Sequence, residues 1–92
     1  MNFEWDPEKA AASFEKHAVS FEEAASVFGD PLAVSYLDPD HSQTEHRFLT
    51  FGCSHFGRQI VVSHTDRLNR VRIITARLMT RRERKAYEET EF

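Results

Sequence analysis

Three segments rich in β-branched and aromatic residues follow one another in the second half of this chain, and only short links separate them. They span residues 47–54, 59–65 and 70–77. Such residues favour strands, and strands joined by short links pair as antiparallel hairpins because parallel strands need a long crossover. A further strand is expected at 32–37, after the break at Gly29-Asp30-Pro31. The sequence therefore predicts an antiparallel sheet of about four strands.

Three helices are predicted from their start signals, two before these strands and one after them. A capping box, in which Ser or Thr precedes Glu by three residues, occurs at 20–23 and again at 80–83. Asp6 followed by Pro7 is another favoured helix start. The helices are expected at about 7–18, 20–28 and 80–89, with a short strand at 3–5 before the first. This order predicts an α+β fold with two N-terminal helices and one C-terminal helix packed on the sheet.

The length of 92 residues allows one small core, so we expect a single domain over residues 1–92. Cys53 is the only cysteine and cannot form an internal disulfide. The N-terminus lacks the pattern of a secretory leader, and no apolar run reaches the roughly 18 residues of a membrane helix. We therefore expect a soluble, cytoplasmic protein with no membrane partner.

The charges are distributed unevenly along the chain. Residues 1–46 hold two Lys and ten Asp or Glu, whereas residues 47–92 hold nine Arg, one Lys and five Asp or Glu. Between residues 67 and 85 seven Arg and one Lys stand against a single acid, Glu83. Such a basic segment indicates an anionic partner, but the overall pI of about 5.9 argues against indiscriminate binding. Any such binding must be local.

Metal, nucleotide and thiol chemistry find little support in the sequence. The five His and one Cys have no zinc-type spacing, and the three Gly form no phosphate-binding loop. The stretch 38–41 is typical of a solvated turn, and Cys53 is expected to be a small core residue rather than a nucleophile. We therefore predict no metal site and no cofactor.

The arginines are the feature that points to a ligand. A guanidinium group binds phosphate through two parallel hydrogen bonds, and the start of the last helix adds backbone donors. Lys9, Lys16 and His17 on the first helix offer a second basic edge. A run of charges more often forms a solvated face, so the residues alone leave anion binding and simple solvation both open.

The last predicted helix has few apolar residues. Only Ala86 and Tyr87 are clearly apolar, which is too few to bury one face of a helix. We therefore expect this helix to dock weakly on the sheet or to be completed by a partner.

Several motifs, taken in order along nearly the whole chain, resemble those of the BrnT family of toxins of type II toxin-antitoxin systems. They are Phe-Glu-Trp-Asp-Pro-Glu-Lys-Ala at 3–10, Glu-Lys-His at 15–17, Val-Ser-Phe-Glu-Glu-Ala at 19–24, Asp-Pro-Asp-His at 38–41, Arg-Ile-Ile-Thr-Ala-Arg at 72–77, and Arg-Arg-Glu-Arg-Lys-Ala-Tyr-Glu at 81–88. The resemblance implies a RelE-like ribonuclease fold and cleavage of messenger RNA that arrests translation. It also implies neutralisation by a BrnA-type antitoxin with a ribbon-helix-helix domain, through which DNA would be contacted only indirectly.

The resemblance also suggests site residues. The basic residues at matching positions are Lys9, Lys16, His17, Arg47, Arg72, Arg77, Arg81 and Arg82. Metal-independent cleavage uses the RNA 2′-hydroxyl as nucleophile, so the enzyme must supply an acid, a base and positive charge. Arg72 and Arg77 are the candidates for stabilising the phosphate. His17 or His64 is the candidate acid or base, because only histidine titrates near neutrality without a shift in its pKa.

Two classes of function follow from these observations. The first is a metal-independent endoribonuclease toxin. The second is a non-catalytic interaction module within a DNA-bound repressor complex. Growth arrest on expression of the chain alone separates the two.

Overall fold

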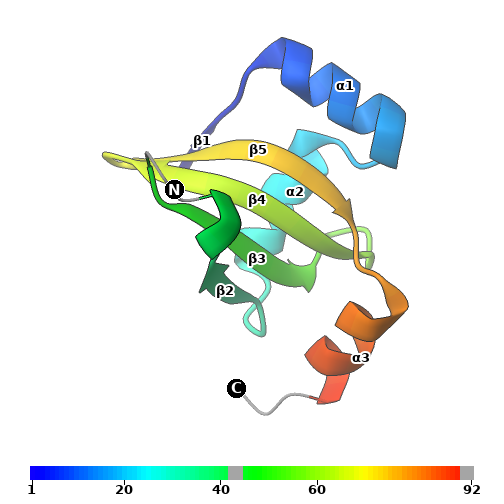
Figure 1. Ribbon diagram of the computed structural model, residues 1–92. Helices are drawn as coiled ribbons and strands as arrows, with labels where there is room; N and C mark the ends of the chain where they lie inside the picture. Colours follow the sequence, from blue (N-terminus) through cyan, green and yellow to red (C-terminus); the bar gives the residue numbers. More distant parts are fainter. Residues whose placement is uncertain (42–44, 90–92) are drawn as a thin grey trace.

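The computed structural model describes residues 1–41 and 45–89, which form three α-helices, two short 3₁₀ helices and one sheet. In chain order the elements are β1 (Asn2–Glu4), α1 (Pro7–His17), α2 (Phe21–Ser26), η1 (Val27–Gly29), β2 (Val34–Leu37), η2 (Pro39–His41), β3 (Arg47–Cys53), β4 (Gln59–Arg67), β5 (Arg70–Leu78) and α3 (Arg81–Glu89). The α+β class is therefore confirmed, and Figure 1 shows the elements along the chain. None of the helices in the described ranges is long and apolar enough to cross a membrane.

The sheet has five strands in the order β1-β5-β4-β3-β2. The four strands predicted to form the sheet, β2 to β5, pair antiparallel as expected. The prediction of about four antiparallel strands was nevertheless incomplete, because β1 joins the sheet as a fifth strand, parallel to β5. Alternating side chains identify a strand but not its neighbour, and β1 lies far from β5 in sequence. No hairpin signal could reveal this pairing.

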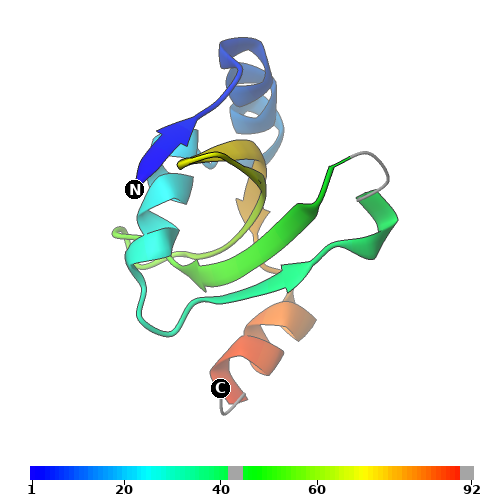
Figure 2. The ribbon, with the colours of Figure 1, turned by 90° about the vertical axis from the view of Figure 1, so that its left-hand side faces the viewer.

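Helix α2 lies against one face of the curved sheet, α1 lies beside β5, and α3 extends from the end of β5 (Figures 1 and 2). The buried core forms where α2 and its flanking residues meet the strands. It contains Val19, Phe21, Ala24 and Val27 on the helical side and Ile60, Val62, Ile73 and Ala76 on the sheet side. Burial of these side chains supplies the main driving force for this arrangement.

The pairing of β4 with β5 contains an irregularity that matters for the surface. Ser63 pairs with Thr75, but the next residue, His64, pairs with Ile73, so Ile74 has no opposite residue. Such a bulge adds one residue to a strand and changes the direction in which the neighbouring side chains point. Ile74 and Thr75 consequently lie at the junction of two surface hollows, described below.

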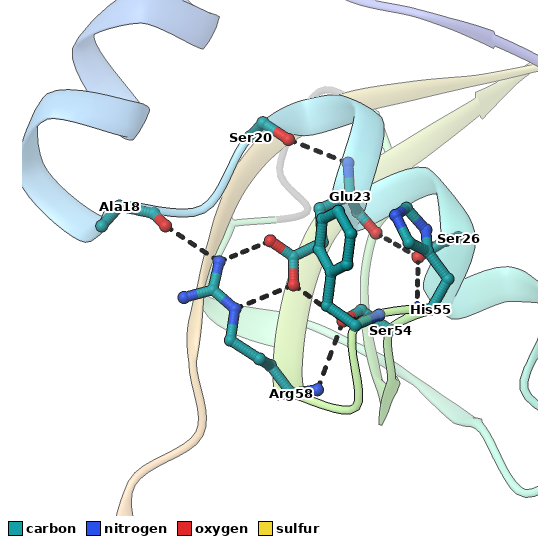
Figure 3. A network of polar contacts seen from close by, with 8 residues as sticks. Ala18, Ser20, Glu23, Ser26, Ser54, His55 and Arg58 are labelled. Atoms are coloured by element: carbon teal, nitrogen blue, oxygen red, sulfur yellow. Dashed lines mark hydrogen bonds and ion pairs between the residues drawn. The ribbon is translucent and has the colours of Figure 1, made fainter.

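An ion pair between half-exposed Arg58 and the buried carboxylate of Glu23 connects the β3–β4 turn to α2 (Figure 3). Ser20 caps α2, because its Oγ accepts a hydrogen bond from the Glu23 backbone N–H at 3.0 Å. The Glu23 carboxylate does not complete a capping box; it accepts hydrogen bonds from the Arg58 guanidinium and from Ser54 Oγ. Arg58 also donates to the carbonyl oxygen of Ala18 at 2.9 Å. The hydrogen bond from Arg58 is the main reason why the pKa of Glu23 is lowered.

Polar contacts connect α3 to the rest of the domain, and none of its described residues is buried. Tyr87 donates a hydrogen bond from its hydroxyl to Asp30 Oδ2 at 2.5 Å, and Gln59 donates to Glu88 at 2.8 Å. Burial and the hydrogen bond to Asp30 together raise the pKa of Tyr87. The scarcity of apolar residues in this helix predicted weak docking on the sheet. In the structure, these hydrogen bonds supplement its small apolar contact.

Candidate functional site

Two hollows adjoin on the surface beside β5, and both are lined by Ile74 and Thr75. The first, of about 310 Å³, lies against α1 and is lined by Lys9, Lys16 and His17. The second, of about 370 Å³, is also lined by Asp38, Asp40, Arg47, Leu49, Ser63 and Arg77. Five of the nine predicted site residues, from separate parts of the chain, therefore share one surface.

The side of α1 that carries Lys9 and Lys16 is fixed by packing against β5. Lys9, Ser13 and Lys16 are spaced by four and three residues, so they lie on the same side of the helix. Between the two lysines, the Ser13 hydroxyl lies 3.4 Å from both the N and the O of Ala76 in β5. This contact holds the lysines beside the bulge. His17, half-buried, is the last residue of the same helix.

Arg77 is near the end of β5, and its guanidinium is held by the carboxylate of Glu83 in the first turn of α3. Nη1 and Nη2 donate to the two carboxylate oxygens of Glu83 at 2.7 and 3.0 Å. Nη1 also donates to the carbonyl oxygen of Leu78 at 3.2 Å. The hydrogen bonds from Arg77 lower the pKa of Glu83 to about 2, and the same pair raises the pKa of Arg77. Both groups are therefore charged at neutral pH.

The second hollow contains acids as well as arginines. Asp38 and Asp40 line it together with Arg47 and Arg77. The backbone N–H of Asp38 donates to the carbonyl oxygen of Arg47 at 2.7 Å, which keeps these two residues adjacent. The local charge is therefore mixed, and the excess of positive charge comes from the α1 side.

The other predicted arginines lie outside the two hollows. Arg72 is opposite β1, where its Nη1 donates to Glu4 Oε2 at 2.9 Å. Arg81 and Arg82 are exposed in the first turn of α3. Arg82 lines a different, apolar hollow of about 200 Å³ between α3 and the sheet, together with Tyr36.

His64 does not meet the arginines. Its side chain is 4% exposed and lies on the helix-facing side of the sheet, with its ring 4.9 Å from the ring of Phe28. Its Nε2 is 2.7 Å from the Thr50 hydroxyl. Burial lowers the pKa of His64, although Asp66, 3.5 Å from Nδ1, opposes this shift. Ser63, next to His64 in β4, faces the opposite side of the sheet and lines the same hollow as Arg77.

Sequence reasoning missed three residues that shape the site. Ser13 was not singled out, and Ile74 was not expected to form a bulge, because neither a serine in a helix nor an isoleucine in a strand is unusual. Glu83 was identified, but only as the cap of the last helix. The spacing of six residues between Arg77 and Glu83 was the one signal that could have suggested their pairing.

The described part of the chain contains no group of three or more His, Cys, Asp or Glu side chains that could hold a metal ion. Cys53 is half-buried, and its backbone N–H donates to Asp30 Oδ2 at 2.8 Å. The thiol is therefore less deeply buried than the predicted core position implied.

Comparisons with known proteins agree with this architecture. The sequence model of the family described as "Ribonuclease toxin, BrnT, of type II toxin-antitoxin system" matches residues 5–83. A crystal structure of the Brucella abortus ribonuclease toxin BrnT superposes with a TM-score of 0.65 at 17% identity, covering 88% of this chain and 99% of that one. A comparison with curated protein sequences gave no match. The family match spans most of the chain, and the chain therefore belongs to the BrnT family of ribonuclease toxins of type II toxin-antitoxin systems.

Proposed function

We propose that this toxin is a metal-independent endoribonuclease that cleaves messenger RNA at the surface formed by the two adjoining hollows. The observation that carries the proposal is the convergence of Lys9, Lys16 and His17 from α1 with Arg47 and Arg77 from the sheet. Clustered cations on one surface suit an RNA backbone, which carries one negative charge per nucleotide. These five side chains would therefore contact the phosphates of an RNA strand bound on this surface.

The proposed reaction uses the RNA itself as nucleophile. The 2′-oxygen attacks the adjacent phosphorus and loses its proton, and the bond from phosphorus to the 5′-oxygen breaks as that oxygen gains a proton. The products are a 2′,3′-cyclic phosphate and a 5′-hydroxyl. The protein must therefore transfer protons and stabilise the negative charge on the phosphoryl oxygens.

Among the predicted residues, Arg77 and His17 are best placed for these roles. Arg77 would donate hydrogen bonds to the phosphoryl oxygens, and His17, at the rim of the neighbouring hollow, would transfer a proton. Lys9, Lys16 and Arg47 would hold flanking phosphates, and Arg81 and Arg82 would extend the basic surface along α3. We assign neither Arg72 nor His64 a role at the phosphate, because Arg72 is paired with Glu4 and His64 is buried on the other face.

Metal independence belongs to the same proposal. It is supported by the charged side chains that line the two hollows, where four Lys or Arg outnumber two Asp, and by the lack of a clustered set of metal ligands among the described residues. A reaction with an internal nucleophile can use arginine and lysine where other nucleases use divalent ions.

A type II toxin has an antitoxin as its partner, and we propose one of the BrnA type with a ribbon-helix-helix domain that contacts DNA. An antitoxin segment with acidic and apolar residues would cover β5 and α3, over residues 70–88, and block RNA binding. We include a RelE-like relationship of the fold and a cytoplasmic site of action in this proposal.

Induced expression in a bacterial host tests the proposed function. We expect growth arrest with new RNA 5′ ends in the wild-type culture, and neither effect with Arg77→Ala at equal protein level. Growth arrest without new RNA ends would contradict RNA cleavage as its cause, and no growth arrest would favour the alternative of a non-catalytic module that binds a partner.

A further inference from the structure

The hydrogen bonds of Arg77 leave one edge of its guanidinium open. A guanidinium group has five N–H donors. Three are used, because Nη1 donates to Glu83 Oε1 and to the Leu78 carbonyl oxygen, and Nη2 donates to Glu83 Oε2. The Nε–H and the second N–H of Nη2 have no partner among the described residues. These two donors are parallel and lie on one edge of the group, which is the arrangement that binds two oxygens of a phosphate.

We propose that Glu83 is a positioning residue for Arg77, which orients the guanidinium so that its Nε and Nη2 edge receives the scissile phosphate. The inference rests on the proposed role of Arg77 in RNA cleavage. Glu83 would not touch the RNA. It would act by fixing the orientation of the group that does.

The position of Glu83 supports this role because its own side chain is fixed. Glu83 Oε1 accepts a hydrogen bond from the Thr80 backbone N–H at 2.8 Å, and the Glu83 N–H donates to Thr80 Oγ1 at 3.1 Å. The hydrogen bond from the Thr80 backbone N–H anchors the carboxylate at the start of α3, whereas Thr80 Oγ1 contacts only the Glu83 backbone. The carboxylate in turn limits the rotation of the long Arg77 side chain, so less conformational entropy is lost when a phosphate binds.

Charge alone predicts the opposite effect for the same residue. A carboxylate beside Arg77 reduces the local positive charge and should weaken RNA binding in the ground state. A positioning role instead requires that loss of Glu83 slow the chemical step, since misplacing a catalytic group by about 1 Å can lower the rate by roughly a hundredfold. The two effects fall on different kinetic constants.

The experiment measures kcat and KM of the purified toxin on a fluorescently labelled, mixed-sequence single-stranded RNA. The variants are Glu83→Gln, Arg77→Ala and the double substitution, with Thr80→Ala as the matched control. Thr80→Ala removes the side-chain half of the capping box but keeps the Arg77–Glu83 pair. Circular dichroism and thermal unfolding establish that each variant is folded.

We expect Glu83→Gln to lower kcat by roughly ten- to a hundredfold without raising KM, and Thr80→Ala to stay near the wild-type rate. In the Arg77→Ala background, Glu83→Gln should have no further effect. An unchanged or increased kcat in Glu83→Gln would overturn the inference, as would equal losses in Glu83→Gln and Thr80→Ala. If Glu83→Gln does not fold, Glu83→Asp takes its place. This variant keeps the charge on a shorter side chain and should also have a kcat below that of the wild type, and wild-type kcat in this variant would overturn the inference. Full activity of Arg77→Ala would instead contradict the proposed function itself.

Discussion

The hydroxyl of Ser13 in α1 lies 3.4 Å from both the backbone N and the backbone O of Ala76 in β5. β1 pairs only with residues 70–72 of β5. The Ser13 hydroxyl therefore contacts backbone groups of Ala76 that a longer neighbouring strand would otherwise pair. The same contact sets Lys9 and Lys16 beside the β5 bulge. One side chain thus links the closure of the sheet edge to the formation of the basic surface.

Removing this hydroxyl should cost both stability and activity. We expect Ser13→Ala to lower the free energy of unfolding by about 1 kcal/mol, because the Ala76 N–H and C=O lose their partner and the original contacts are long. The proposed RNA cleavage should also slow, because α1 is held less firmly. Urea unfolding followed by circular dichroism measures the first effect, with Ala12→Ser, on the same helix, as a control for the serine content of α1. Unchanged stability would show that the contact contributes nothing.

The ion pair between Arg58 and Glu23 should contribute more to the free energy of unfolding than the Ser13 contact does. Arg58→Ala leaves the 3% exposed carboxylate of Glu23 without its charged partner. Breaking a fully buried pair costs roughly 3–5 kcal/mol. We expect about 2 kcal/mol here, because the Arg58 side chain is 37% exposed and solvent screens it. Urea unfolding of Arg58→Ala and of the exposed-site control Lys85→Ala checks this value. Similar midpoints for the two variants would contradict it.

His64 should make the stability fall in mild acid. Burial lowers the pKa of His64 in the folded protein, whereas the unfolded chain titrates near the ordinary value of about 6.5. Below that pH the unfolded state binds more protons than the folded state, so stability decreases as pH falls from about 6.5 toward the lowered pKa. The slope from this one group is at most about 1.4 kcal/mol per pH unit.

The measurement is urea unfolding at several values between pH 7 and pH 5. His64→Gln, which keeps a polar group near Thr50, should lose most of this dependence, whereas exposed His55→Gln should retain it. Equal pH dependence in all three proteins would show that His64 does not titrate as its burial implies.

Protonation of Glu83 in strong acid should break its ion pair with Arg77 and destabilise α3. Its pKa of about 2 lies below the unfolded value of 4.5, so its contribution is present above pH 4.5 and is lost as pH falls toward 2. We expect the protection of α3 amides from hydrogen exchange to fall in this range, and Glu83→Gln to show no such step. A step of the same size in Glu83→Gln would assign the transition to another carboxylate.

Much of the architecture was predictable because its signals are local. The capping residues Ser20 and Thr80 mark the starts of α2 and α3, and the hairpin strands follow from β-branched residues and short links. The parallel pairing of β1 and the contact of Ser13 with Ala76 join residues more than sixty positions apart. No local pattern encodes such contacts, so the place of β1 in the sheet and the position of the lysines could not be predicted.

The candidate site was predictable only as a set of residue types. The arginines of the second half look equivalent in sequence, but Arg58 is paired with Glu23, Arg72 with Glu4 and Arg77 with Glu83. What separates them is the surface on which each pair lies. Of these three, only Arg77 lines the hollow beside the bulge, which adjoins the hollow lined by Lys16 and His17.

Cleavage should proceed in excess EDTA, because the proposed reaction uses the 2′-hydroxyl and protein cations. The purified toxin should leave 2′,3′-cyclic phosphate and 5′-hydroxyl ends, which enzymatic end-labelling identifies. RNA with a 2′-deoxy nucleotide at the cleavage site should be resistant. Loss of cleavage in EDTA, with recovery on addition of a divalent ion, would rule out the metal-independent mechanism.

The central claim is that Arg77, and not the basic segment in general, stabilises the reacting phosphate. Its most direct test compares the RNA cleavage rate of Arg77→Ala with that of Arg72→Ala, both on β5 and both paired with a glutamate. We expect a loss of roughly a hundred- to a thousandfold for Arg77→Ala, as for removal of a donor to a transition-state oxyanion, and a rate within a few-fold of wild type for Arg72→Ala. Equal losses in the two variants, or wild-type cleavage by Arg77→Ala, would contradict the account.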